Sequence, residues 1–176
     1  MTADTRPERH VYGSPDAPVT ILEFGDLECP YCRAAAPVLR EVVDASDGLA
    51  RLVWRHFPLF EVHPYALTAA LAAEAAATVG RFWDLHDVLL AHQDHLAEPD
   101  LRRYARDLGI DPALVAGPAA QEFAPSVEAD YLAGVAMGVR GTPTILVDGI
   151  VHPGRPQVEP LLTAVRTAAR VRGVAR

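Results

Sequence analysis

Cys29 and Cys32 are the only cysteines in the chain, and two residues separate them in the segment Cys29-Pro30-Tyr31-Cys32. Pro30 suits the first position of a helix, where its missing N–H costs nothing. The start of a helix offers free backbone N–H groups and the positive end of the helix dipole, so we expect it to stabilise a thiolate at Cys29. A thiolate with a second thiol in reach is typical of thiol–disulfide exchange. The spacing therefore indicates redox chemistry.

The attacking form of such a cysteine is the thiolate, whereas an unperturbed thiol with a pKa near 8.5 is mostly protonated at neutral pH. We predict that the helix start lowers the pKa of Cys29 to about 7 or below. Two carboxylates close in sequence, Asp26 and Glu28, oppose this shift if they face the sulfur. Tyr31, between the cysteines, supplies no positive charge.

Half of a zinc site is the competing interpretation of two cysteines at this spacing. Tetrahedral zinc normally needs four protein ligands, and the chain has no second cysteine pair. His92 and His95 are three residues apart, but they fall in a predicted helix and are interpreted as solvent-facing. We interpret three further histidines as structural because their spacing demands no metal: His56, His63 and His86. The sequence thus predicts no metal and no bound cofactor.

Apolar periodicity places the cysteines between a buried strand, Val19–Phe24, and a helix that contains Pro37. The predicted order is strand, helix, strand, helical block, hairpin and helix, over residues 19–24, 30–43, 51–57, 64–138, 144–152 and 158–169. Asp148-Gly149 is the expected two-residue turn of the hairpin. Within the block, the pattern predicts helices over 64–79, 81–95 and 100–108, one beginning at Asp111-Pro112, and one around 127–135.

Composition limits the classes of function. A chain of 176 residues, half of them apolar, suits one domain. Its formal charge of −7 disfavours a nucleic-acid partner, because such a surface repels phosphates. No apolar run approaches the roughly 18–20 residues of a membrane span. The start of the chain lacks the apolar core of a signal peptide, which favours the cytoplasm and leaves an exported, trimmed form open. We expect a monomer, with the oligomeric state open.

The order of elements and the motifs together resemble the DsbA-like branch of the thioredoxin fold, from about Val11 to the final helix. The anchors are Glu23–Cys32, Pro37, Arg55–Leu59, His63-Pro64, Gly80–Trp83 and Gly141–Thr144. The chain is similar especially to bacterial forms found alone or fused to transporters. The resemblance implies an α/β protein, a thioredoxin fold with an inserted all-helical subdomain. Its expected parts are a core over 11–60 and 139–172, an insertion over 61–138, and a polar, flexible terminus over 1–10.

The resemblance also implies roles for individual residues. Cys29 matches the exposed attacking cysteine, and Cys32 matches the shielded cysteine that resolves the mixed disulfide. Glu23 matches an acid that relays protons to the second cysteine; the alternative is a strand glutamate that faces solvent. A buried carboxylate with a raised pKa suits such a relay.

Four residues form the expected substrate-binding set: Pro30, Tyr31, Thr142 and Pro143. The resemblance implies that Pro143 is held cis beside the sulfurs and that Thr142 pairs with an extended substrate segment. DsbA has histidine where this chain has Tyr31, so we expect a less extreme thiolate and a less oxidising couple.

The leading hypothesis is a protein thiol–disulfide oxidoreductase that acts on protein or peptide thiols and disulfides through a mixed disulfide at Cys29. One alternative is a glutathione-linked oxidoreductase or transferase, since the sequence CPYC also occurs in glutaredoxins. Another is a redox-idle module that binds peptides. The direction of electron flow depends on the reduction potential of the surrounding compartment.

Overall fold

The computed structural model describes residues 9–174. A five-stranded mixed sheet forms its centre, with the strands in the order β1-β3-β2-β4-β5. The strands are β1 (Val11–Tyr12), β2 (Val19–Gly25), β3 (Ala50–His56), β4 (Thr144–Val147) and β5 (Ile150–Val151). Strand β2 pairs in parallel with β3 and antiparallel with β4, so the central strand is hydrogen-bonded on both sides. Its seven residues are accordingly buried or half-buried.

Helices α1 (Pro30–Asp44) and α7 (Val158–Val171) pack together and share one apolar cluster with the sheet. Each turns a stripe of apolar residues to the sheet at helical spacing, Leu39 and Val42 from α1 and Leu161 and Val165 from α7. Pro30 is at the first turn of α1 and Pro37 lies within it. A second cluster, built around Phe24 and Phe57, packs against α6 (Ala124–Ala136).

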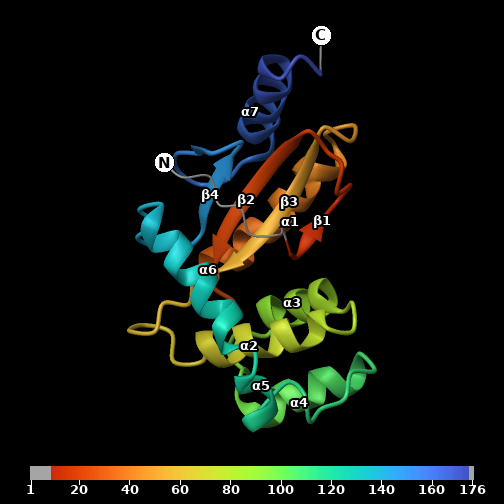
Figure 1. Cartoon of the computed structure of the whole chain (residues 1–176), viewed down its shortest axis with the longest axis vertical. Coiled ribbons are helices and arrows are strands. Elements are labelled where there is room, and N and C mark those ends of the chain that lie inside the picture. The colour runs from red at the N-terminus through yellow and green to blue at the C-terminus, as the bar shows by residue number, and fades with distance from the viewer. Residues whose placement is uncertain (1–8, 175–176) are drawn as a thin grey trace.

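The segment between β3 and β4 is helical, with α2 (Ala66–Ala77), α3 (Phe82–Ala91), α4 (Glu98–Asp107) and α5 (Pro118–Gln121) before α6. Figure 1 shows α2–α5 gathered at one end of the sheet, with α6 running from them back to the core. The fold is thus a thioredoxin-like sheet with a helical insertion, as the sequence predicts. In the described part of the chain, no helix is both long and apolar enough to span a bilayer.

Several local predictions are wrong. No helix begins at Asp111-Pro112; the Asp111 carboxylate instead accepts a hydrogen bond from the N–H of Ala113 and closes a turn. The helices α2 and α3 are shorter than the periodicity indicated, and the sequence did not predict β1 or α5. Two apolar residues of α6, Leu132 and Val135, are more than half exposed.

The expected flexible terminus, residues 1–10, also needs correction where the structure describes it. Residues 1–8 lie outside the described range. Arg9 is hydrogen-bonded to Glu74 and Asp130, two buried acids of the helical insertion. His10 stacks on Phe82 with ring centroids 3.7 Å apart. These contacts hold residues 9 and 10 against α2, α3 and α6.

Gly25 is the last residue of β2, and its lack of a side chain determines how closely Trp54 approaches the end of this strand. A Cβ at position 25 would lie 2.1 Å from Cη2 of Trp54, far closer than atoms can approach. Trp54 is 1% exposed and belongs to the cluster that contains Cys29 and Cys32. Glycine at position 25 therefore allows this indole to pack against the end of β2, within the same cluster as the cysteines.

Candidate active site

The two cysteines lie where β2 passes into α1. Cys29 is the N-cap residue of α1, and Pro30 is the first residue of that helix. In its protonated form the Cys29 thiol donates to the carbonyl oxygen of Thr142 over 3.4 Å, and the backbone N–H of Asp26 donates to Sγ of Cys32 over 3.4 Å. Both cysteines are free thiols and lie within hydrogen-bonding range of each other.

The two thiols differ in acidity. A hydrogen bond from Cys32 is the main cause that lowers the pKa of Cys29 to about 5, against the opposing effect of burial. The backbone N–H groups of Tyr31 and Cys32 and the neighbouring Thr142 lower it further. Burial, the hydrogen bond to Cys29 and the charge of Glu23 raise the pKa of Cys32 well above its ordinary value. One sulfur is therefore suited to act as a thiolate, while the other holds its proton.

The exposed position expected for Cys29 is wrong, because the residue is only 2% exposed. The loop before β4 covers it, since the Thr142 carbonyl lies on Sγ. Tyr31, the next but one residue, is 62% exposed and marks where this end of α1 meets solvent. A substrate therefore has to displace the Thr142 contact to reach the sulfur.

Glu23 lies in the middle of β2, opposite Trp54 on one neighbouring strand and Ile145 on the other. It is 1% exposed, so the alternative of a solvent-facing glutamate is wrong. Burial is the main cause that raises its pKa to about 8, and the charge of Cys29 adds to the shift. Its Oε1 has no hydrogen-bond partner among the described residues. At neutral pH this carboxyl group holds a proton beneath the cysteines.

Asp26 and Glu28 bind the segment that follows β3 and do not appear among the main causes of the Cys29 shift. Asp26 accepts hydrogen bonds from the ring of His63 and from the N–H of Leu59, and Glu28 accepts one from the N–H of Tyr65. We therefore infer that these two carboxylates oppose the Cys29 thiolate only weakly.

Gln93, just after α3, contacts the loop that carries the cysteines, and the sequence does not predict this contact. Its side-chain amide donates to the carbonyl oxygens of Leu27 and Cys29, at 3.0 and 2.8 Å. The helical insertion thus binds the backbone on both sides of Glu28. No local pattern signals this role, because Gln93 is 64 residues from Cys29.

Thr142 and Pro143 are joined by a cis peptide bond. They line a groove of about 410 Å³ that extends along the loop before β4 and reaches Val151 of β5. Met137, Val139 and Leu146 give this groove an apolar lining, and Arg140 adds one positive charge. The groove therefore offers an extended apolar segment a place beside the loop that covers Cys29.

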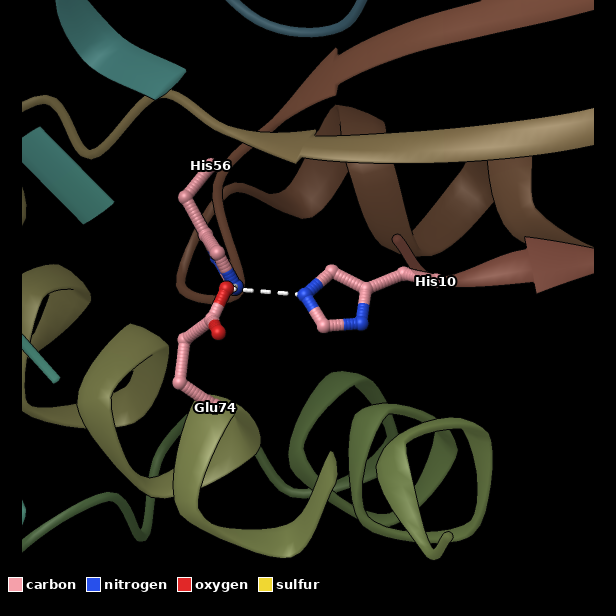
Figure 2. A group of neighbouring side chains, drawn as sticks. All are labelled: His10, His56 and Glu74. Atoms are coloured by element: carbon pink, nitrogen blue, oxygen red, sulfur yellow. Dashed lines mark hydrogen bonds and ion pairs between the residues drawn. The ribbon is translucent and has the colours of Figure 1, made fainter. Parts of the chain in front are cut away.

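One group of side chains in the described part of the chain has the distances of a metal site: His10, His56 and Glu74. Figure 2 shows both rings directed at the carboxylate of Glu74. Nε2 of His10 lies 2.8 Å and Nε2 of His56 lies 3.4 Å from the same carboxylate oxygen. The sequence predicts a structural role for His56 and places His10 in the polar, flexible terminus.

The donors around this cluster do not suit a metal ion. Nδ1 of His56 accepts a hydrogen bond from the indole N–H of Trp54, so the ring carries its proton on Nε2 and offers Glu74 a donor in place of a lone pair. Arg9 also places a guanidinium 2.8 Å from the other oxygen of Glu74. Burial raises the pKa of Glu74, but the hydrogen bond from His10 and the nearby ring of His56 outweigh it and hold that pKa below its usual range. We interpret the cluster as a hydrogen-bonded junction between the terminus, β3 and α2.

Comparison with known proteins places this geometry in a family. The family model described as "Thioredoxin" matches residues 5–166. The chain belongs to the thioredoxin family. Its fold is DsbA-like, as in solved DsbA proteins.

Two solved structures are similar over nearly their whole length. BdbD from Bacillus subtilis, in its oxidised form, is 26% identical with a TM-score of 0.80, covering 92% of this chain and 93% of that one. A thioredoxin-like oxidoreductase from Silicibacter pomeroyi is 30% identical, also with a TM-score of 0.80, and the coverage is 97% and 95%.

A curated relative is the Na(+)/H(+) antiporter NhaA 3 of Salinispora tropica, 48% identical over 92% of this thioredoxin-family chain and 25% of the antiporter. The chain spans about a quarter of the length of the curated relatives it matches. The match agrees with the resemblance to forms fused to transporters.

Proposed function

We propose that this thioredoxin-family chain exchanges disulfides with polypeptide substrates through a mixed disulfide at Cys29 that Cys32 resolves. The observation that carries the proposal is the pair of neighbouring thiols with opposite pKa shifts beside the loop of Thr142 and Pro143. The likeness to a thioredoxin-like oxidoreductase that is 30% identical supports it.

The exchange begins at Cys29. Its thiolate attacks one sulfur of a substrate disulfide, the substrate S–S bond breaks, and the other substrate sulfur leaves as a thiolate. The hydrogen bond from the Cys32 thiol, which stabilises the thiolate before attack, is released as the negative charge moves to the leaving sulfur. An extended substrate segment in the groove beside Thr142 would bring its disulfide to this sulfur.

Cys32 completes the exchange. It loses its proton, attacks the Cys29 sulfur of the mixed disulfide and forms the Cys29–Cys32 disulfide, while the substrate leaves with two thiols. The substrate gains two electrons, and the enzyme dithiol loses them. We assign Glu23 as the group that exchanges the Cys32 proton: with a pKa of about 8, its deprotonated form, the minor form at neutral pH, accepts the proton that Cys32 loses. The reverse sequence oxidises a substrate dithiol, and the reduction potential of the compartment sets the direction.

Dithiothreitol-driven reduction of insulin tests the proposal. The wild-type chain should accelerate the reaction, and Cys29→Ser should remove the acceleration because no mixed disulfide can form. Cys32→Ser should accumulate mixed disulfide at Cys29, visible by mass spectrometry. A redox-idle peptide-binding module would leave the insulin rate unchanged by the wild-type chain. A glutathione-linked enzyme would instead be active only in a glutathione-coupled assay.

A further inference from the structure

Asp26 has a buried carboxylate that the proposed exchange does not use. Its side chain is fully buried, yet both oxygens are occupied. Oδ1 accepts from the N–H of Glu28 at 2.8 Å, and Oδ2 accepts from the N–H of Leu59 at 2.9 Å and from Nδ1 of His63 at 2.8 Å. The carboxylate therefore joins the active-site loop to the segment after β3.

The backbone of Asp26 touches the reacting atoms. Its N–H donates to Sγ of Cys32, and its carbonyl oxygen accepts from the N–H of Cys29 over 3.1 Å. A donor on Sγ favours the thiolate form of Cys32, and it is one of the groups that lower the pKa of this thiol against burial. The orientation of the peptide unit at Asp26 thus bears on the sulfur that must ionise second.

His63 is the only side chain among the described residues recorded as a donor to this carboxylate; the other two donors are backbone N–H groups. Its Nδ1 faces a carboxylate oxygen, so that nitrogen carries a proton whether the ring is neutral or charged. The ring is mostly buried, with 18% of the side chain exposed. Loss of this donor would leave Oδ2, inside the protein, with the Leu59 N–H alone.

We propose that His63 is a positioning residue for the resolving step: it holds Asp26 so that the backbone N–H of Asp26 stays on Sγ of Cys32. This role rests on the proposed function, because it presumes that Cys32 attacks a mixed disulfide at Cys29. It concerns the second step alone. The groups that lower the pKa of Cys29 are Cys32, Thr142 and the nearby N–H groups, and His63 is not among the main ones.

Single-turnover reaction of the reduced chain with dithiobis(nitrobenzoate), a small coloured disulfide, separates the two steps. Attack by Cys29 releases one nitrothiobenzoate, and resolution by Cys32 releases a second, so stopped-flow absorbance shows two phases. His63→Ala should slow the second phase roughly three- to tenfold, the effect of one lost hydrogen bond, and leave the first phase unchanged. His63→Asn, whose side-chain N–H replaces Nδ1–H, should restore most of the rate.

The other possible results of this experiment contradict either the proposed function or the role of His63. If the wild-type chain shows no second release, or Cys32→Ser still shows one, the proposed function itself is wrong. If the wild type shows both phases and His63→Ala resolves at the same rate, the positioning role is wrong. Equal slowing of both phases, or no rescue by His63→Asn in a variant with the wild-type circular dichroism spectrum, identifies a general structural role and overturns the inference.

Discussion

At the scale of single residues, the site depends on two chemically identical groups in different surroundings. Cys29 receives hydrogen bonds at the start of α1, whereas Cys32 is fully buried beneath it with a buried glutamate nearby. Hydrogen bonds to the charged form lower a pKa, and burial without compensation raises it. The difference in acidity between the two sulfurs therefore follows from position in the helix.

Cys32 should itself control the acidity of Cys29, because its hydrogen bond is the largest cause of the shift. We expect Cys32→Ala to raise the pKa of Cys29 from about 5 by at least about one unit, since the main donor to the thiolate is lost. Cys32→Ser keeps a donor and should have a smaller effect. Thiolate absorbance as a function of pH measures the pKa of Cys29 in both variants. A pKa above 8 for Cys29 in the wild-type chain would contradict the assignment of Cys29 as the attacking thiolate.

At the scale of elements, the helical insertion supports the active-site loop directly. Gln93 binds the backbone at Leu27 and Cys29, and His63 binds Asp26, while the N–H of Tyr65 binds Glu28. The core sheet supports the same loop through Trp54, which packs against Gly25. The loop that carries the cysteines is thus held from both sides.

Gly25→Ala tests the support from the sheet. The added methyl group would overlap the Trp54 ring, so we expect a loss of about 1–3 kcal/mol in the free energy of unfolding and a changed near-ultraviolet dichroism signal. Urea unfolding measures the free energy of unfolding. Gly141→Ala is the matched control, because a Cβ there meets no atom within 4 Å and should change stability little. Equal stability of Gly25→Ala and wild type would show that the indole can move aside.

At the scale of the whole molecule, the junction of His10, His56 and Glu74 joins the N-terminal segment, β3 and α2. Arg9 and Asp130 extend it to α6. The pKa of His10 is lowered, chiefly by burial, so the folded state favours its neutral ring. A buried group of acids and bases of this kind is costly to interrupt, because each remaining charge would lose its partner.

Glu74→Gln should destabilise the chain by about 3 kcal/mol at pH 7, since it removes the negative charge that Arg9 and both histidines face and replaces one acceptor oxygen with an NH2 donor. The pKa of Glu74 is lower when folded than when unfolded, where it is 4.5. Its stabilising contribution is thus complete above pH 4.5 and is lost as the pH falls below that value. Urea unfolding should show a smaller difference between variant and wild type at pH 3. The exposed Glu128→Gln is the control and should change stability by less than about 0.5 kcal/mol.

The sequence predicts features that depend on neighbours along the chain, such as Pro30 at the start of α1 and the Asp148-Gly149 turn, where both residues have positive φ. It does not predict contacts made across the fold. The cover over Cys29 comes from Thr142, 113 residues away, and the partner of Asp26 is His63, 37 residues away. The polar composition of residues 1–10 likewise concealed the anchoring of His10, because its partners lie on other elements.

The position of the Trp54 indole has one more consequence. Its indole packs in the same cluster as both sulfurs and lies edge-on to His86, with ring centroids 4.6 Å apart. The light that an indole emits is sensitive to nearby sulfur and imidazole groups. We expect indole emission from this cluster to change as the Cys29–Cys32 bond opens and closes, so that the exchange can be followed in real time without a dye.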